Sequence, residues 1–192
     1  RAARLLASFD AMDQMMELFY QHKGLTNSFE KNTPAAVVKA NSLPSQHLNI
    51  RYARMFAGAF MYAAGNHIGI EWGSVPGLAQ GAPYVLDGDG ARVSGSLFGW
   101  GIGHEIGHNI NQSQYAVAEV TNNYFAQLSQ TDGTSASARF SYDEVYDRVT
   151  SGDEGRTGSV FTQLAMYWQL RLAYDAGGAY QLYDTYQQAF DN

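Results

Sequence analysis

The stretch that decides the fold runs from Gly99 to Asn123 and reads Gly-Trp-Gly-Ile-Gly-His-Glu-Ile-Gly-His-Asn-Ile-Asn-Gln-Ser-Gln-Tyr-Ala-Val-Ala-Glu-Val-Thr-Asn-Asn. At its centre, His104 to His108 form the pattern His-Glu-x-x-His. On a helix the two histidines lie one turn apart on one face, so both imidazoles can reach a single metal ion. Two neutral imidazoles and a carboxylate suit zinc, with a further position open to water that Glu105 can hold. The sequence therefore predicts a zinc site.

This five-residue pattern also arises by chance, so the prediction depends on a third ligand. Residues 109–118 contain no His, Cys, Asp or Glu, and Glu119 is the first candidate after them. A metzincin would need Gly and His where this chain has Asn111 and Gln114, which excludes that class. A site like that of peptide deformylase needs a cysteine, and the chain has none. These exclusions leave a glutamate-type zinc peptidase with Glu119 as the third ligand.

The residues after the second histidine predict how Glu119 reaches the metal. Polar residues with turn preference cluster at 111–113, so the first helix should end there, and a second helix from about Tyr115 should fold back with Glu119 facing the histidines. Asn123 lies one helical turn beyond Glu119. It, or Asn122, could accept the N–H of a ligand imidazole, a support that is general at histidine-ligated metals. The alternative for both asparagines is a solvated helix surface.

These motifs also resemble a known family. The run His-Glu-Ile-Gly-His-Asn, the preceding Trp100-Gly101 and the segment 119–123 are similar to the enhancin-like zinc metallopeptidases, which comprise viral enhancins and bacterial mucin-degrading proteases. The segment 61–70 resembles the strand region before the motif in that family, so the resemblance covers about residues 55–125. It implies cleavage of O-glycosylated, mucin-like proteins, with a sugar beside the scissile bond forming part of what is recognised.

Composition sets broad limits. With 192 residues, 45% hydrophobic and 16% charged, residues 1–192 should form one soluble domain. The net charge of -6 and the scattered basic residues argue against a nucleic-acid surface. No apolar run approaches the length that spans a bilayer. Because the chain opens on Arg1, we expect a fragment of a larger multi-modular protein, secreted by or displayed on a bacterium, whose signal lies upstream.

The periodicity of apolar residues predicts an α+β domain of the zincin kind, mainly helical, with a small sheet before the His-Glu-x-x-His helix. Expected helices cover residues 2–22, about 52–63, 141–149 after a Ser141/Glu144 capping box, and a long segment from about 160 capped by Thr157 or Ser159. Residues 180–190 should form one more helix or lead into a further C-terminal domain. Residues 66–72 should be an exposed edge strand that pairs with extended substrate.

The expected mechanism assigns Glu105 as the general base toward a zinc-activated water, with one zinc ion held by His104, His108 and Glu119. The oxyanion would also need a donor, either a tyrosine or an arginine such as Arg156 or Arg171. Trp72 and Trp100 flank glycine-rich segments and are candidates for the substrate cleft.

Two other classes of function stay open. One is a non-catalytic module, derived from a peptidase, that binds glycoprotein or carbohydrate. The other is a helical interaction domain in which the motif is a coincidence, and this class predicts no stoichiometric zinc.

Overall fold

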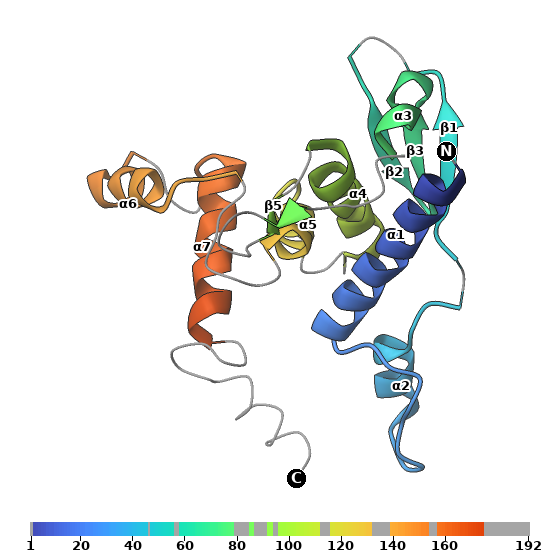
Figure 1. Ribbon diagram of the computed structural model, residues 1–192. Helices are drawn as coiled ribbons and strands as arrows, with labels where there is room; N and C mark the ends of the chain where they lie inside the picture. Colours follow the sequence, from blue (N-terminus) through green and yellow to red (C-terminus); the bar gives the residue numbers. More distant parts are fainter. Residues whose placement is uncertain are drawn as a thin grey trace.

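Helices dominate the structure, a computed structural model that describes residues 2–45, 47–55, 58–78, 85–86, 92–93, 96–111, 116–131, 139–153 and 157–174. Two helices, α4 (Ile102–Ile110) and α5 (Thr121–Thr131), lie in the middle of the molecule (Figure 1). On one side are α1 (Ala2–His22) and a small sheet, and on the other are α6 (Tyr142–Ser151) and α7 (Val160–Tyr174). The mainly helical α+β class, with a sheet before the His-Glu-x-x-His helix, is confirmed.

The sheet corrects two predictions. Its strands are β1 (Asn49–Ala53), β2 (Met61–Ala64) and β3 (His67–Glu71), in the order β1-β3-β2. The helix expected over residues 52–63 is wrong, since that segment holds the end of β1, a turn with Gly58 at φ +85°, and β2. Residues 66–72 do contain a strand, but β3 lies in the middle, parallel to β1 and antiparallel to β2. The edges are β1 and β2, and β2 packs against α4.

A close approach on this sheet depends on a glycine. Tyr62 of β2 pairs in register with Gly69 of β3, and a Cβ at Gly69 would lie 1.9 Å from the Tyr62 ring. The ring therefore lies against the glycine, and it meets the His67 ring edge-on at 5.6 Å between ring centroids. This arrangement covers the middle strand on the face opposite to Ile68 and Ile70, which are fully buried.

The core lies where α1, the sheet, α4, α5 and α7 meet. The amphipathic helix predicted at the start of the chain is confirmed as α1, and its buried stripe faces β3 and α4. Trp168 of α7 is fully buried, as the helical spacing of its neighbours predicts. The buried members of the core are Met12, Met15, Phe19, Ile68, Ile70, Ile102, Ile106, Phe125, Leu128 and Trp168.

Capping residues set the starts of the last two helices. Ser141 accepts a hydrogen bond from the backbone N–H of Glu144, which confirms the predicted start of α6. Ser159 accepts one from the N–H of Thr162 at 3.2 Å, so of the two predicted caps Ser159 is the one that begins α7. The helix predicted at 180–190 lies outside the described residues.

Short elements connect these parts. They are α2 (Ala35–Asn41), η1 (Trp72–Ser74), α3 (Val75–Leu78), the strand pair β4 (Val85–Leu86) and β5 (Arg92–Val93), and the π-helical turn η2 (Ser96–Gly101) that leads into α4. No helix in the described ranges is both long enough and apolar enough to cross a membrane.

Candidate metal centre

The centre is built where α4 packs against α5, and two glycines on one face of α4 allow the close approach. A Cβ at Gly103 would lie 2.8 Å from Ser129 Oγ and 3.1 Å from Ala126 Cα. A Cβ at Gly107, one turn later, would lie 2.6 Å from the carbonyl oxygen and 2.7 Å from the Cα of Asn122. The close packing at Gly107 brings the start of α5 beside the two histidines.

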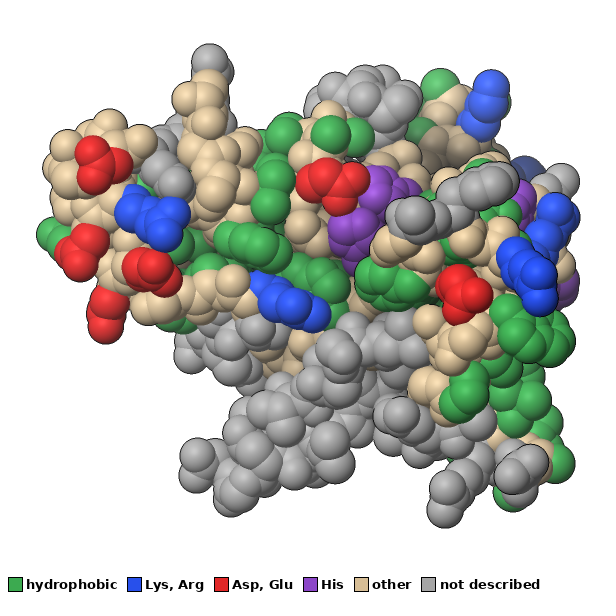
Figure 2. Space-filling model, turned by 90° about the horizontal axis from the view of Figure 1, so that it is seen from above, with side chains coloured by type: hydrophobic (Ala, Val, Ile, Leu, Met, Phe, Trp, Pro, Cys, Tyr) green, Lys and Arg blue, Asp and Glu red, His purple; other side chains and the backbone are tan. Residues whose placement is uncertain are grey.

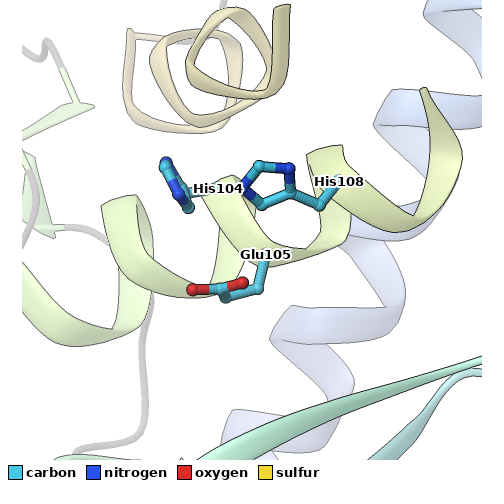
Figure 3. A group of neighbouring side chains, drawn as sticks. All are labelled: His104, Glu105 and His108. Carbon is cyan, nitrogen blue, oxygen red and sulfur yellow. The ribbon is translucent and has the colours of Figure 1, made fainter. Parts of the chain in front are cut away.

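Both imidazoles leave α4 on the same side, as Figure 3 shows, while Glu105 leaves it on a neighbouring side. The rings of His104 and His108 are 4.8 Å apart between centroids and nearly perpendicular, at 86°. One ligand atom from each of His104, Glu105 and His108 lies within 4.8 Å of the others. This is the arrangement that the i, i+4 spacing predicts.

Glu119 comes to the same point from the other element. Its Oε2 lies 3.2 Å from His104 Nε2, and its Oε1 lies 3.4 Å from His108 Nε2. The backbone differs from the prediction, however, because the described residues 116–120 are not helical and α5 begins only at Thr121. Glu119 therefore reaches the histidines from a turn before the helix.

That turn holds Glu119 in an unusual conformation. Its φ is +59°, in the left-handed region that costs a residue with a Cβ about 1 kcal/mol or more. The turn is closed by hydrogen bonds from the N–H groups of Val120 and Thr121 to the carbonyl of Val117, at 3.0 and 3.1 Å. The Asn123 side-chain amide also donates to the carbonyl of Glu119. These contacts fix the direction of the carboxylate.

Asn123 also contacts the first histidine. Its Oδ1 lies 2.6 Å from His104 Nδ1 and accepts that hydrogen. With the proton on Nδ1, the lone pair of Nε2 points toward Glu119, which is the tautomer that a metal requires. Asn123 is buried, with an exposed fraction of 4%. Its amide thus orients both the His104 ring and the backbone of Glu119.

The two carboxylates of the centre have different surroundings. Glu105 is 7% exposed, and burial raises the pKa of its carboxyl; Glu119 raises that pKa further and His104 opposes the shift. The Glu119 side chain is 51% exposed, and its two oxygens lie 3.2 and 3.4 Å from the Nε2 atoms of His104 and His108. Glu105 is thus the buried carboxylate of the centre, and Glu119 is the exposed one.

The donor set fits zinc. In a tetrahedral site with bonds of about 2.0–2.2 Å, neighbouring ligand atoms are about 3.3–3.6 Å apart, close to the 3.2 and 3.4 Å between Glu119 and the two Nε2 atoms. Burial lowers the pKa of His108, His104 lowers it further and Glu119 opposes the shift, so the neutral imidazole that binds metal prevails. In Figure 2, histidine side chains are exposed next to an acidic side chain near the middle of the face shown.

The other candidate residues are separated. Trp72 is 67% exposed and meets Tyr52 edge-on at 6.1 Å between centroids. Trp100 is only 8% exposed and packs with Ala126 and Leu164, so its predicted place in the cleft is corrected to one in the core. Arg171 lies over the Trp168 ring in α7, 4.8 Å from its centroid, and Arg156 lies outside the described residues.

The residues at the end of α1 contact both α4 and α5, a role that the sequence did not indicate. Lys23 donates a hydrogen bond to the carbonyl of Ile110, the last residue of α4, and burial lowers the pKa of this amine. His22 Nε2 lies 2.9 Å from the hydroxyl of Tyr124 in α5. These residues line a pocket of about 330 Å³ beside the end of α4. A cation at a helix C-terminus is favourable, so Lys23 holds the helix that carries the histidines.

The fold and the site together define a zincin-type domain, helix-rich with a His-Glu-x-x-His helix against a small sheet. The sequence profile of the family "Peptidase M60, enhancin and enhancin-like" matches residues 10–190. The chain belongs to this family, as its motifs indicated. No curated protein sequence matches the chain.

Solved structures show the same fold. The M60 catalytic domain of ZmpC from Clostridium perfringens, in complex with the sialyl T antigen, is 22% identical and superposes with a TM-score of 0.53 over 87% of this chain and 30% of that one. The M60 catalytic domain of Clostridium perfringens ZmpB, solved with two CBM51 domains, is 21% identical with a TM-score of 0.60 over 88% of this chain and 16% of that one.

A third structure, a functionally unknown conserved protein from Bacillus anthracis, is 21% identical with a TM-score of 0.57, over 88% of this chain and 32% of that one. The chain thus spans between 16% and 32% of the length of these three solved proteins.

Proposed function

We propose that this chain is the catalytic part of a zinc-dependent endopeptidase that hydrolyses peptide bonds in O-glycosylated, mucin-like proteins. The observation that carries the proposal is the convergence of Glu119 on both Nε2 atoms, at 3.2 and 3.4 Å, with Glu105 beside them. A chance motif on a helix surface does not predict a third ligand delivered by a separate, strained turn. In this proposal His104, His108 and Glu119 hold one zinc ion.

Zinc bound there would supply a Lewis acid for the scissile carbonyl and would lower the pKa of water toward about 7. Glu105 accepts the proton of the attacking water at its carboxylate and passes it to the departing amine. Its burial supports this role, because a carboxyl with a raised pKa gives up a proton at a pH closer to neutrality. Asn123 keeps His104 in the required tautomer throughout.

The substrate backbone is proposed to lie along β2. This strand is an edge of the sheet and α4 packs against it, so an extended peptide could pair with β2 beside the helix that carries the histidines. Trp72 offers an exposed aromatic face beyond the end of β3 for sugar or peptide. The complex of the ZmpC domain with the sialyl T antigen supports a glycosylated substrate. Since mucin-like proteins are extracellular, we place the protein outside a bacterial cell, secreted or at the surface.

The test is digestion of an O-glycosylated mucin and its enzymatically deglycosylated form, each with and without chelator, read by mass spectrometry of the new termini. We expect chelator-sensitive cuts in the glycosylated sample alone. Cuts in both samples would instead show a general zinc peptidase. Zinc-loaded protein that binds mucin and cuts neither sample would favour the non-catalytic binding module.

Glu105→Gln separates catalysis from metal binding. Loss of the proton acceptor should lower the cleavage rate by about 10²–10⁴-fold, while one zinc per chain remains bound. Glu17→Gln on the exposed face of α1 is the matched control and should cleave at the wild-type rate. A Glu105→Gln protein that holds zinc and cleaves like the wild type would contradict the assignment of the base.

A further inference from the structure

A cavity between α1 and β1 lies on the opposite side of α4 from the imidazoles. Its volume is about 440 Å³, and the start of α1 lies beside β1 in Figure 1. Ile102 and Ile106 of α4 line it. Ile106 is two residues from His104 and from His108, and two residues turn a helix by about 200°. A ligand in this cavity therefore stays clear of the metal centre.

The cavity has an apolar floor and a rim of polar and aromatic side chains. The isoleucines of the floor are fully buried or nearly so, whereas the rim residues belong to the exposed surface. Sites for small molecules have this composition, with mostly apolar walls, a few polar groups that orient the ligand, and volumes of about 300–1,000 Å³. The floor includes Met12, Ile68, Ile102 and Ile106, and the rim includes Phe9, Asp13, His47 and Tyr52.

The polar groups of the rim are available to a ligand. Among the described residues, neither the Asp13 carboxylate nor the His47 ring has a hydrogen-bond or ion-pair partner. Asp13 accepts hydrogen bonds only, so it selects a ligand with N–H or O–H groups. No described residue that lines the cavity is a lysine or an arginine, and an anionic ligand would be repelled by Asp13. The lining therefore favours a neutral ligand that is apolar at one end and carries donors at the other.

An exposed aromatic pair extends the rim on the side of the sheet. Tyr52 of β1 is 39% exposed and lines the cavity, and Trp72 meets it edge-on at 6.1 Å between ring centroids. This contact orients the Tyr52 ring. The face of an aromatic ring carries negative charge density, so it attracts the C–H groups of a saturated ring, such as a pyranose.

We propose that this cavity binds a neutral N-acetylated pyranose sugar at a site separate from the metal centre. The acetamido methyl group packs on the apolar floor, the N–H and hydroxyl groups donate to Asp13, and the C–H face of the ring packs against Tyr52. No proposed metal ligand takes part, so the inference does not depend on the proposed function. A sugar held here would tether the domain to a glycosylated surface and leave the metal centre open.

The test titrates the methyl glycosides of N-acetylglucosamine and N-acetylgalactosamine into the whole chain with chelator present. Trp72 reports occupancy because it is 67% exposed, whereas Trp100 and Trp168 are 8% and 0% exposed. Bound sugar should protect Trp72 from quenching by acrylamide, with a dissociation constant of about 1 mM for a ligand of this size. Methyl glucoside and methyl galactoside lack the acetamido group and should bind about 10-fold more weakly. The tighter of the two N-acetyl epimers identifies the class of glycan that supplies the ligand.

Two variants locate the sugar, with affinity measured by NMR titration. Asp13→Ala removes the acceptor and should weaken binding about 10-fold, and Tyr52→Ala removes the aromatic face and should weaken it about 5-fold. Asp10→Ala is the matched control, because Asp10 is exposed one turn earlier on α1, carries the same charge and does not line the cavity. It should bind sugar like the wild type.

Several results would overturn the inference and leave the proposed function standing. They are no protection of Trp72 well above the expected dissociation constant, equal binding of the sugars that lack the acetamido group, and wild-type affinity in Asp13→Ala and Tyr52→Ala. Protection by an uncharged apolar tetrapeptide and not by sugar would show that the cavity takes a peptide instead. A chain that binds sugar and no zinc keeps this inference and loses the proposed function. If Tyr52→Ala does not fold, Asp13→Ala decides, because Asp13 is an exposed residue of α1.

Discussion

Gly107 lies at the contact on which the metal centre depends, and Gly107→Ala is the change whose consequence the structure specifies most fully. The new methyl carbon would lie 2.6 Å from the carbonyl oxygen and 2.7 Å from the Cα of Asn122. Both are backbone atoms, so no side-chain rotation relieves the overlap. Ordinary contact begins at 3.4 Å, which requires α5 to move by about 0.8 Å (3.4 − 2.6).

Two terms of opposite sign set the change in stability. Overpacking of this kind costs about 1–3 kcal/mol, and alanine in place of glycine favours the helix by about 1 kcal/mol. The free energy of unfolding should therefore fall by only about 0–2 kcal/mol. The same movement carries Glu119, Asn122 and Asn123 away from the histidines. Because such sites tolerate displacements of about 0.5 Å, we expect zinc affinity to fall about 10–100-fold.

The assay pairs zinc affinity, measured by competition with a coloured chelator, with denaturant unfolding of the metal-free protein. Gly103→Ala is the control, because its new methyl meets the rotatable Ser129 hydroxyl at 2.8 Å and the Ala126 Cα at 3.1 Å, and a movement of about 0.3 Å suffices. Its zinc affinity should change much less. A folded Gly107→Ala protein that binds zinc within about twofold of the wild type refutes the reasoning that helix separation sets the site.

Three further predictions concern other contacts. In Lys23→Met the carbonyl at the end of α4 loses its hydrogen bond from the amine, so zinc affinity should fall severalfold in the same chelator competition. The control is Lys39→Met at an exposed position, which should bind zinc like the wild type. Gly69→Ala displaces the Tyr62 ring, which lies 1.9 Å from the new Cβ, and should lower the free energy of unfolding, measured in urea, by about 1–3 kcal/mol. In the Tyr62→Ala background the same substitution should have little effect, because the overlapping ring is gone. Burial raises the folded-state pKa of Glu105, so its ionised form weakens the metal-free fold as pH rises through that pKa. Glu105→Gln removes this charge and should therefore raise the thermal stability of the metal-free protein above that of the wild type at pH 8. At pH 4, where the wild-type carboxyl is protonated, the two proteins should unfold at similar temperatures.

Local rules account for the elements that were predicted well. The helical spacing in α1, the serine caps of α6 and α7, and the one-turn separation of the two histidines depend on residues within one or two turns of each other. Such patterns act before any tertiary contact forms. The family resemblance rests on the same local run.

The errors occurred where a local pattern fits two structures. Apolar residues between 52 and 63 match one face of a helix, but Gly58 at φ +85° breaks the segment into two strands that pair with β3. Whether β3 is an edge or a middle strand depends on which partners return to it, and spacing along one strand carries no such information. Trp100 was misplaced for a similar reason, since the residues that cover it, such as Ala126 and Leu164, come from distant segments.

The sequence by itself determined which side chains are proposed for the metal: two histidines one turn apart, a glutamate between them and a second glutamate within reach, because metal chemistry selects side chains and a helix sets their spacing. Only the tertiary structure decided the direction of Glu119, which comes from a left-handed turn held by Asn123 instead of a helix face. It alone brought Lys23 to the last carbonyl of α4. The physical reason is that such contacts depend on how closely α4, α5 and α1 approach, which is a property of packing across the whole chain.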